Sequence, residues 1–294
     1  MTTAADARSP ATGYALVAIA ASSWGLWPLI LDRASAFGGI DSSLESLIVM
    51  LALTLGAAPI MLRDRVSGRA PLRAWVALGW LGVTDAMNVV LFFRAYQTTS
   101  VAIAVVTHYL APLFVALAAP IFLSEKSKQR TYVTAFAGFC GLVILLHPWT
   151  ADRKPNDLLG AGYGAASAVF YASNVIVNKR LMPYFSGSEL AFFHGLVSVP
   201  LLWAFVPTGA WQDADPRGLW WLLLGAIGPG AVSGLLFVWG LRRIQASRAS
   251  TLTLLEPFVA VLTAAVFLHQ PVSIATFVGG AIILASAALV VSRP

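Results

Sequence analysis

The chain has 294 residues, of which 58% are hydrophobic and 11% charged, with a mean hydropathy of +0.78. Soluble proteins carry roughly 25% charged residues, and one or two water-soluble cores cannot bury this much apolar surface. The composition therefore argues against a cytosolic enzyme, a nucleic-acid-binding protein and a disordered scaffold. It predicts an integral membrane protein, and the continuous apolar runs indicate helices rather than the alternating strands of a barrel.

The formal net charge of +6 is interpreted as a topology signal, because the 19 lysines and arginines lie in short loops. The single cysteine, Cys140, lies in an apolar run and excludes an intrachain disulfide. The apolar run over 11–31 has no small-residue cleavage signature, so we expect a first membrane helix rather than a cleaved signal.

Ten apolar runs lie between charged or Pro/Gly-rich breaks, and a bilayer core of about 30 Å needs roughly 20 helical residues. The weakest boundary separates the third run from the fourth, where only residues 94–97 interrupt. The ten runs predict membrane helices at 11–31, 44–62, 74–93, 98–122, 131–147, 158–178, 189–206, 218–241, 249–268 and 273–291.

Loop charges predict the orientation of these helices. With the N-terminus in the cytoplasm, fourteen basic residues face inward and five face outward, which favours two cytoplasmic termini. The inner set is Arg8, Arg63, Arg65, Arg69, Arg73, Lys126, Lys128, Arg130, Lys179, Arg180, Arg242, Arg243, Arg248 and Arg293, and the outer set is Arg33, Arg94, Arg153, Lys154 and Arg217.

An internal repeat divides the chain. A shift of 145 residues superposes 75–123 on 220–268 without a gap, with identical residues at twelve of 49 positions, among them Trp75/Trp220 and Pro112/Pro257. Chance in so Ala- and Leu-rich a sequence would give roughly four or five identities. We therefore expect two five-helix repeats, 1–150 and 151–294, joined outside the membrane by the polar link 148–157.

The odd number of helices in each repeat predicts opposite topologies, because the third helix would run outward and its counterpart inward. Inverted repeats of this kind are typical of transporters, whose substrate site lies near the midplane between the halves. The predicted fold is an all-α integral membrane protein of ten transmembrane helices in two inverted repeats, with a central cavity between them.

A short motif in the first helix and a pair of motifs in the fourth and ninth helices resemble those of a known family. The first helix contains Trp24-Gly25, the fourth contains Ala-Pro112 followed by Phe-Leu-Ser-Glu125, and the ninth contains Glu256-Pro257 followed by Phe-Leu-His-Gln270. The chain resembles the ten-helix EamA-type permeases of the drug/metabolite transporter (DMT) superfamily, over essentially its whole length, and within them the YddG-type exporters of aromatic amino acids. Gln270 departs from the glutamate usual at the end of this motif, which we expect to affect loop anchoring more than transport.

Polar side chains at membrane depth are the candidate site residues, because a central Asp, Lys or Arg costs about 2.5–3.5 kcal/mol on insertion scales. Asp85 and Asn88 share a helix face, and they either line the cavity and relay a proton or act as helix glue. Asn174 is the candidate on the sixth helix.

His108 lies four residues before Pro112, whose ring leaves the His108 carbonyl without its helical partner. It is either part of a pH-sensitive site or bonded to a neighbouring helix.

Glu256 precedes Pro257 at the equivalent kink of the second repeat. It is predicted to carry a proton or to pair with a substrate amine, and the alternative is a bond to a nearby arginine or hydroxyl. Pro112 and Pro257 are the predicted hinges of the transport cycle.

The sixth helix carries one continuous polar face, in which Tyr163 and Tyr171 flank Ser167 and are followed by Asn174 and Asn178. It either lines a wet cavity or forms a polar seam between helices. Trp24 and Trp27 could stack on an aromatic or ammonium-bearing ligand, and Trp239, near the inner end of the eighth helix, is a further candidate.

The function predicted from these residues is an alternating-access permease that exports neutral or aromatic amino acids or related small metabolites. The alternatives are export of other drugs or metabolites, a passive channel, and a membrane protein without transport. We expect no enzyme activity, no metal site, no cofactor and no nucleic-acid partner, while proton coupling stays open.

We further expect a multi-pass protein of the bacterial inner membrane, with the lipid bilayer and a small-molecule substrate as partners. It would be a monomer or a weak dimer through the small-residue faces of helices five and ten, Ala137/Gly141 and Ala281/Ala285.

Overall fold

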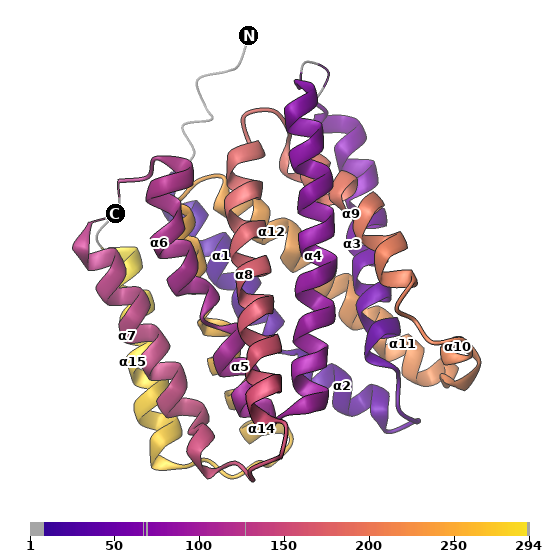
Figure 1. Cartoon of the computed structure of the whole chain (residues 1–294), viewed down its shortest axis with the longest axis vertical. Helices are drawn as coiled ribbons and strands as arrows, with labels where there is room; N and C mark the ends of the chain where they lie inside the picture. The colour runs from indigo at the N-terminus through magenta and orange to yellow at the C-terminus, as the bar shows by residue number, and fades with distance from the viewer. Residues whose placement is uncertain (1–8, 67, 69, 127, 293–294) are drawn as a thin grey trace.

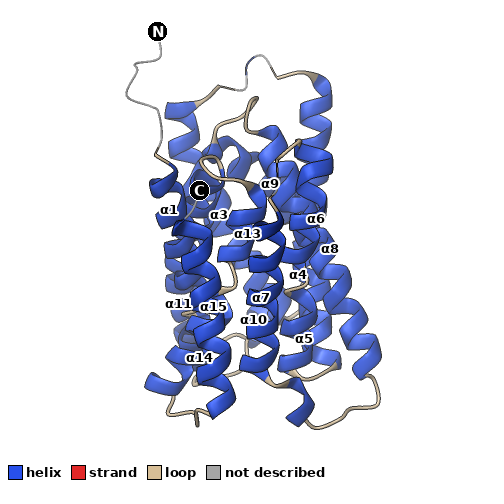
Figure 2. Ribbon diagram, turned by 90° about the vertical axis from the view of Figure 1, so that its left-hand side faces the viewer, coloured by secondary structure: helices blue, strands red, loops and turns tan. Residues whose placement is uncertain are grey.

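The computed structural model of the chain describes residues 9–66, 68, 70–126 and 128–292, and within these ranges it contains helices and no strand (Figure 2). In chain order the α-helices are α1 (Pro10–Trp24), α2 (Trp27–Ser35), α3 (Ser42–Asp64), α4 (Leu72–Thr98), α5 (Val101–His108), α6 (Ala111–Leu123), α7 (Gln129–Leu146), α8 (Asp157–Leu181), α9 (Gly187–Trp203), α10 (Ala210–Asp213), α11 (Pro216–Gly225), α12 (Ser233–Leu241), α13 (Ala246–Leu252), α14 (Leu255–Phe267) and α15 (Ile274–Ser292). A 3₁₀ turn, η3 (Pro148–Thr150), follows α7, and a π-helical segment, η4 (Ala226–Val232), joins α11 to α12.

The long helices stand side by side along the long axis of the molecule (Figure 1). We call the end at which α1 begins the inner end and the opposite end the outer end; α15 finishes at the inner end as well (Figures 1 and 2). α4 runs from the inner to the outer end, whereas α11 and α12 run from the outer to the inner end, as the inverted repeat predicts. Arg8, Arg69 and Arg293 of the charge count lie outside the described residues.

Eight helices or helix pairs in the described part of the chain are long and apolar enough to cross a membrane. They are Pro10–Ser35, Ser42–Asp64, Leu72–Thr98, Val101–Leu123, Gln129–Thr150, Pro216–Leu241, Ala246–Phe267 and Ile274–Ser292. The predicted sixth and seventh spans also form helices, but α9 has only 17 residues and the polar face of α8 lowers its hydropathy. The all-helical membrane fold is therefore confirmed, whereas the number of ten spans stays a prediction.

Four of the spans change helix or helix type partway across. The breaks at Tyr109–Leu110 and at Thr253–Leu254 lie at equivalent places in the two repeats. Pro112 and Pro257 sit in the first turn of α6 and of α14, where a proline is tolerated because the helix has no partner for its N–H there. The other two changes are the junction of α1 with α2 and the π-helical η4, which contains Pro229.

Contacts between the two halves form most of the interior. α4 packs along α8, α3 along α9, α1 along α12, and α5 and α6 along α8. The largest core cluster joins α1, α4, α6, α8, α9 and α12 around Val17, Leu81, Val115, Phe185 and Leu241. The polar residues described next lie in these contacts between halves.

α7 and α15 pack against each other within the chain. A Cβ added to Gly141 would lie 2.9 Å from the Gly279 carbonyl oxygen, so the small residue permits this close approach. Ala281 and Ala285 on α15 are exposed. Intramolecular packing therefore uses Gly141, and a dimer through these two helices stays a prediction.

Candidate functional site

Six aromatic and acidic side chains from both halves meet near the breaks in α5–α6 and α13–α14, and we call them the aromatic cluster. Ring centroids lie 4.7 Å apart for Phe92 and Tyr96, 4.2 Å for Phe92 and His108, and 5.5 Å for His108 and Tyr171. The full set is Phe92, Tyr96, His108, Tyr109, Tyr171 and Glu256. Because α4 and α5 belong to the first half and α8 and α14 to the second, a movement of the halves would change its shape.

Glu256 provides the carboxyl group of the aromatic cluster. It lies in the first turn of α14, and Tyr109 is within reach of a side-chain hydrogen bond to its carboxylate. Tyr96 and Tyr171 also lie near Glu256. Glu256 is half-buried, so part of its surface is open to a small molecule or water.

The break in the first span lies beside Glu256. A Cβ added to Gly25 would lie 2.7 Å from the Glu256 carbonyl oxygen, and the hydroxyl of Thr263 on α14 donates to the Gly25 carbonyl at 3.0 Å. Glycine is therefore required where the first span crosses α14. This contact gives the Trp24-Gly25 element a structural role, while the Trp24 ring packs on Phe237 at 5.4 Å between centroids.

His108 links α5 to α8. Its Nδ1 lies 2.7 Å from the Ser167 hydroxyl, which also donates to the Gly164 carbonyl at 2.8 Å. The hydroxyl has one proton, so when that proton goes to Gly164 the imidazole donates from Nδ1 to Ser167. His108 therefore bonds a neighbouring helix, which is one of its two predicted alternatives, and its ring also lies beside Tyr171. A pH-sensitive role for it stays a prediction.

A second polar group joins α4, α8 and α9, and we call it the α4–α9 network. Asn174 donates from Nδ2 to Asp85 Oδ1 at 3.2 Å and accepts from the Thr84 hydroxyl. His194 Nε2 lies 3.8 Å from Asp85 Oδ2. The network therefore contains Thr84, Asp85, Asn174 and His194, and the structure brings Asp85 and Asn174 together as neighbours.

The remaining predicted site residues lie apart from the aromatic cluster. Asn88 is buried one turn from Asp85, and its side-chain oxygen has no hydrogen-bond partner among the described residues. Trp27 packs against Gly225 of α11 and Gly230 of η4. Tyr163 lies in an open groove of about 550 Å³ near the outer end of α8. Trp239 lies at the inner end, so the predicted residues occupy several places rather than one cavity.

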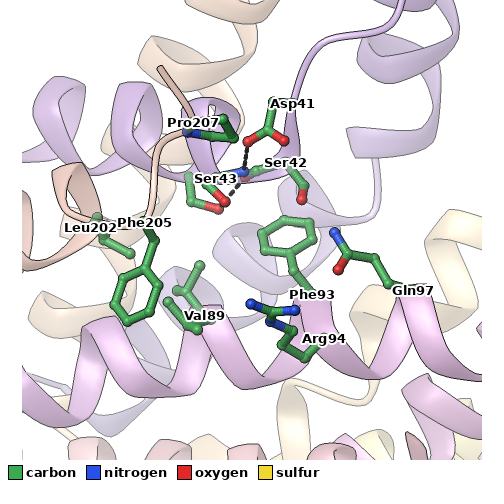
Figure 3. A pocket seen from close by; sticks show the side chains of 12 residues that line it. Asp41, Ser42, Ser43, Val89, Phe93, Arg94, Gln97, Leu202, Phe205 and Pro207 are labelled. Atoms are coloured by element: carbon green, nitrogen blue, oxygen red, sulfur yellow. Dashed lines mark hydrogen bonds between the residues drawn. The ribbon is translucent and has the colours of Figure 1, made fainter. Parts of the chain in front are cut away.

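Two pockets lie at opposite ends of α3. The outer pocket, of about 170 Å³, has Asp41 and Ser43 of α3 on one side and Phe93, Arg94 and Gln97 of α4 on the other (Figure 3). The inner pocket, of about 350 Å³, is lined by Asp64, Val66, Ser186, Gly187, Trp239, Arg242 and Arg243. Each pocket has an aspartate of α3 together with at least one arginine, so each offers both charges to a zwitterion.

Several residues of these sites are absent from the sequence predictions. His194 is a histidine in an apolar run, and this is the same sequence signal that indicates His108. Tyr96 and Tyr109 carry no such signal, because tyrosines are common near the ends of membrane helices. Their place beside Glu256 depends on how the two halves pack.

A membrane-embedded helical bundle with paired breaks, inverted halves and polar groups between the halves defines a transporter. The profile of the EamA-like transporter family matches residues 11–147 and 158–292. The chain belongs to this family of membrane transporters.

Known proteins support this assignment. A protein of Archaeoglobus fulgidus named as an uncharacterized transporter is 29% identical over 235 residues, 79% of this chain and 80% of that protein. The riboflavin transporter of Vibrio cholerae is 32% identical over 117 residues, 40% of this chain and 37% of that protein. The S-adenosylmethionine uptake transporter of Rickettsia felis is 28% identical over 135 residues, 46% of this chain and 44% of that protein. One crystal structure superposes with a TM-score of 0.79 at 20% identity, over 94% of this chain and 97% of that one, and it shows the shared fold.

Proposed function

We propose that the protein exports neutral or aromatic amino acids, or related small metabolites with an amino group, by alternating access. The observation that carries this proposal is the aromatic cluster, in which one carboxylate, Glu256, is surrounded by rings contributed by both halves. We further propose that it acts in the bacterial inner membrane with both termini in the cytoplasm, as a monomer or weak dimer.

The chemistry of the aromatic cluster suits an amine with an apolar side chain. The Glu256 carboxylate can accept hydrogen bonds from an ammonium group, and aromatic faces attract cations as well as other rings. The six side chains of the cluster include no lysine or arginine, which phosphorylated solutes need as partners. The carboxyl group of an amino acid could be held by a donor such as the Tyr109 hydroxyl.

We propose that transport proceeds by rocking of the two halves, with the breaks before Pro112 and Pro257 as hinges. Since the aromatic cluster draws helices from both halves, the movement would open it first to one end of the bundle and then to the other. The outer and inner pockets are the candidate mouths of the path, because both offer positive and negative groups to a zwitterion.

Uptake into proteoliposomes tests this proposal. The purified protein is assayed with a panel of labelled amino acids, with and without a pH gradient. We expect accumulation of phenylalanine, tryptophan or leucine above that of lysine and glutamate, and trans-stimulation by unlabelled substrate inside the vesicles. High flux without trans-stimulation would indicate a channel, and no flux of any amino acid would contradict the proposed substrate class.

A second candidate substrate class is aromatic heterocyclic metabolites. The observation that favours it is the same ring-lined carboxylate, together with the names of the relatives that carry riboflavin and S-adenosylmethionine. Both compounds therefore belong in the panel. Transport of either one without transport of amino acids would select this class.

A further inference from the structure

The α4–α9 network holds an acid and a base that the proposed substrate site does not use. Asp85 on α4 and His194 on α9 face each other with 3.8 Å between Oδ2 and Nε2. His194 is buried and Asp85 is largely buried. α4 belongs to the first half and α9 to the second, so the pair lies across the interface at which the halves must move.

Hydrogen bonds fix the protonation of the imidazole at one nitrogen. His194 Nδ1 lies 2.6 Å from the Leu190 carbonyl oxygen, and a carbonyl can only accept, so Nδ1 carries a proton. In the neutral imidazole the other nitrogen, Nε2, then presents a lone pair to Asp85 Oδ2. Two acceptors facing each other in a buried site repel, and one added proton turns them into donor and acceptor.

The surroundings leave Asp85 Oδ2 ready for this proton. Oδ1 accepts from Asn174, whereas Oδ2 is buried and has no hydrogen-bond partner among the described residues. Ser198 on α9 is near enough to interact with Asp85, and its hydroxyl donates to the Gly82 and His194 carbonyl oxygens at 2.9 and 3.1 Å. An unpaired buried carboxylate oxygen is costly, so the arrangement is most favourable when Nε2 or Oδ2 holds a proton.

Few other ionisable groups reach the pair. On α8, Tyr171 lies near Asp85 and Asn174 is a neutral donor and acceptor, and on α4 Thr84 is a further neutral neighbour. On α3, Thr54 faces Gly195, the residue after His194. Since none of these neighbours supplies a positive charge, a proton is what neutralises Asp85.

We propose that Asp85 and His194 form a proton-binding site that couples proton movement to the transport cycle, an inference that rests on the proposed transport function. A proton from one side of the membrane binds Nε2 and is shared with Oδ2, which changes the charge of the pair from −1 to 0. The neutral pair holds α4 against α9. Release of the proton to the other side returns the net charge of the pair to −1, so Nε2 and Oδ2 again repel each other and the contact between the halves loosens.

Packing around the pair makes it sensitive to such a change. A Cβ added to Gly82 would lie 2.6 Å from both the His194 carbonyl oxygen and Val197 Cβ, so α4 and α9 are in backbone contact one turn from Asp85. A small separation at this crossing would break the Ser198 bond to Gly82 as well. Charge at Asp85 and separation of the halves are therefore linked.

Nuclear magnetic resonance of ¹⁵N-histidine-labelled protein tests the site without any substrate. His194→Gln assigns the His194 signals among the four histidines. We expect these signals to show the Nδ1–H form and to titrate with pH in the wild type. In Asp85→Asn the pH at the midpoint of this titration curve should fall by about one unit or more, because the imidazolium loses its anionic partner. Asp85→Glu should restore it in part.

A matched control is Asp215→Asn, which removes a carboxylate at the outer surface, where hydrogen bonds from Arg217 lower the pKa of Asp215. This variant should leave the His194 titration unchanged. Identical His194 curves in the wild type and Asp85→Asn would overturn the proposal. If Asp85→Asn does not fold, the infrared carboxyl band of Asp85 in His194→Gln gives the same answer, and a band that titrates as in the wild type would also overturn it.

Labelled phenylalanine in proteoliposomes then separates coupling from transport. We expect Asp85→Asn to keep trans-stimulated exchange. The acceleration of net flux by a pH gradient should be at least about tenfold smaller in this variant than in the wild type. Full gradient-driven flux in this variant would overturn the coupling role. If phenylalanine is not carried by any variant, the proposed substrate class fails, whereas the magnetic resonance result still decides the proton site.

Discussion

One pair of equivalent spans has the same helix break in both halves of the molecule, whereas another pair differs in helix type. α5–α6 and α13–α14 break at equivalent positions, with Pro112 and Pro257 in the first turn after the break. α4 is continuous over 27 residues, whereas its counterpart contains the π-helical η4 with Pro229. The shared break belongs to the repeated unit, whereas the π-helical η4 has no counterpart in α4.

α8 shows how the repeated joints are held. At its outer end Lys154 donates from Nζ to the Thr99 carbonyl oxygen at 3.2 Å, before α5. At its inner end Lys179 donates from Nζ to the Ile244 carbonyl oxygen at 2.7 Å, before α13. Thr99 and Ile244 are 145 residues apart, so a lysine near each end of α8 fixes the same joint of the two repeats.

The polar side chains break this symmetry. Glu256 has Ala111 at its counterpart position, and Asp85 has Gly230. One half therefore contributes the carboxylate of the aromatic cluster and the other contributes the acid of the α4–α9 network. Variants at these positions and their counterparts test whether the tasks are divided in this way.

The largest expected effect is that of Glu256→Gln. A hydrogen bond to a charged group contributes about 1.5–3 kcal/mol, so loss of the carboxylate should lower both exchange and net uptake of a labelled amino acid by about 10- to 100-fold. Initial rates in proteoliposomes measure this, with Glu125→Gln, which removes a carboxylate that bonds the Ala246 N–H at the inner end, as the matched control. Retained exchange with loss of gradient-driven uptake alone would instead assign Glu256 a proton-carrying role.

Replacement of Pro112 and Pro257 by alanine tests the shared break. Alanine restores the N–H that proline lacks and allows α5 to continue into α6, and α13 into α14. We expect the double variant to reach the membrane and to transport roughly three- to tenfold more slowly, with a smaller loss in each single variant. Wild-type rates in the double variant would contradict the hinge role.

Much of this fold could be predicted from the sequence, because membrane insertion depends on local hydropathy. The ends of most helices lie within a few residues of the predicted runs, and the 145-residue repeat with Pro112 and Pro257 located the paired break. The sequence indicates the break at Gly25 and the π-helical η4 less clearly. Pro28 and Pro229 lie nearby, but a proline in a membrane helix can be accommodated by several kinds of local backbone change, so it does not predict which one forms.

The site could be predicted only in part. Membrane depth selected Asp85, Asn174, His108 and Glu256, since polar groups there need partners. Which partners they have depends on packing between helices far apart in the chain. His194 is 109 residues from Asp85 in sequence, and no local pattern pairs them. Tyr163 shares the polar face of Tyr171, but it lies near the outer end of α8, where that face meets the surface groove.

Gly82 tests the continuous span of the first half. An alanine methyl there would press on the His194 carbonyl and on Val197, and overpacking of this kind costs about 1–3 kcal/mol. We expect Gly82→Ala to lower the midpoint of thermal unfolding in detergent by several degrees. Ile227→Ala at the counterpart position, where Ile227 is 51% exposed, should change it little. Equal effects of the two variants would contradict the asymmetry.

The smallest expected effect concerns the glutamate of the family motif and its missing partner. Both carboxylate oxygens of Glu125 accept from the Ala246 N–H, at 2.8 and 3.0 Å, at the first residue of α13. A carboxylate at a helix N-terminus contributes typically about 1 kcal/mol, and Glu125→Gln keeps one acceptor but removes the charge. We therefore expect a loss of stability of about 0.5–1 kcal/mol by denaturant unfolding in detergent, with transport nearly unchanged. Gln270→Glu, which restores the usual residue in the second copy, should gain less than this loss, because Gln270 is exposed whereas Glu125 is half-buried, and solvent weakens the interactions of an exposed carboxylate. A gain as large as the Glu125 loss would mean that the two repeats anchor this loop alike and that Gln270 has weakened the second anchor.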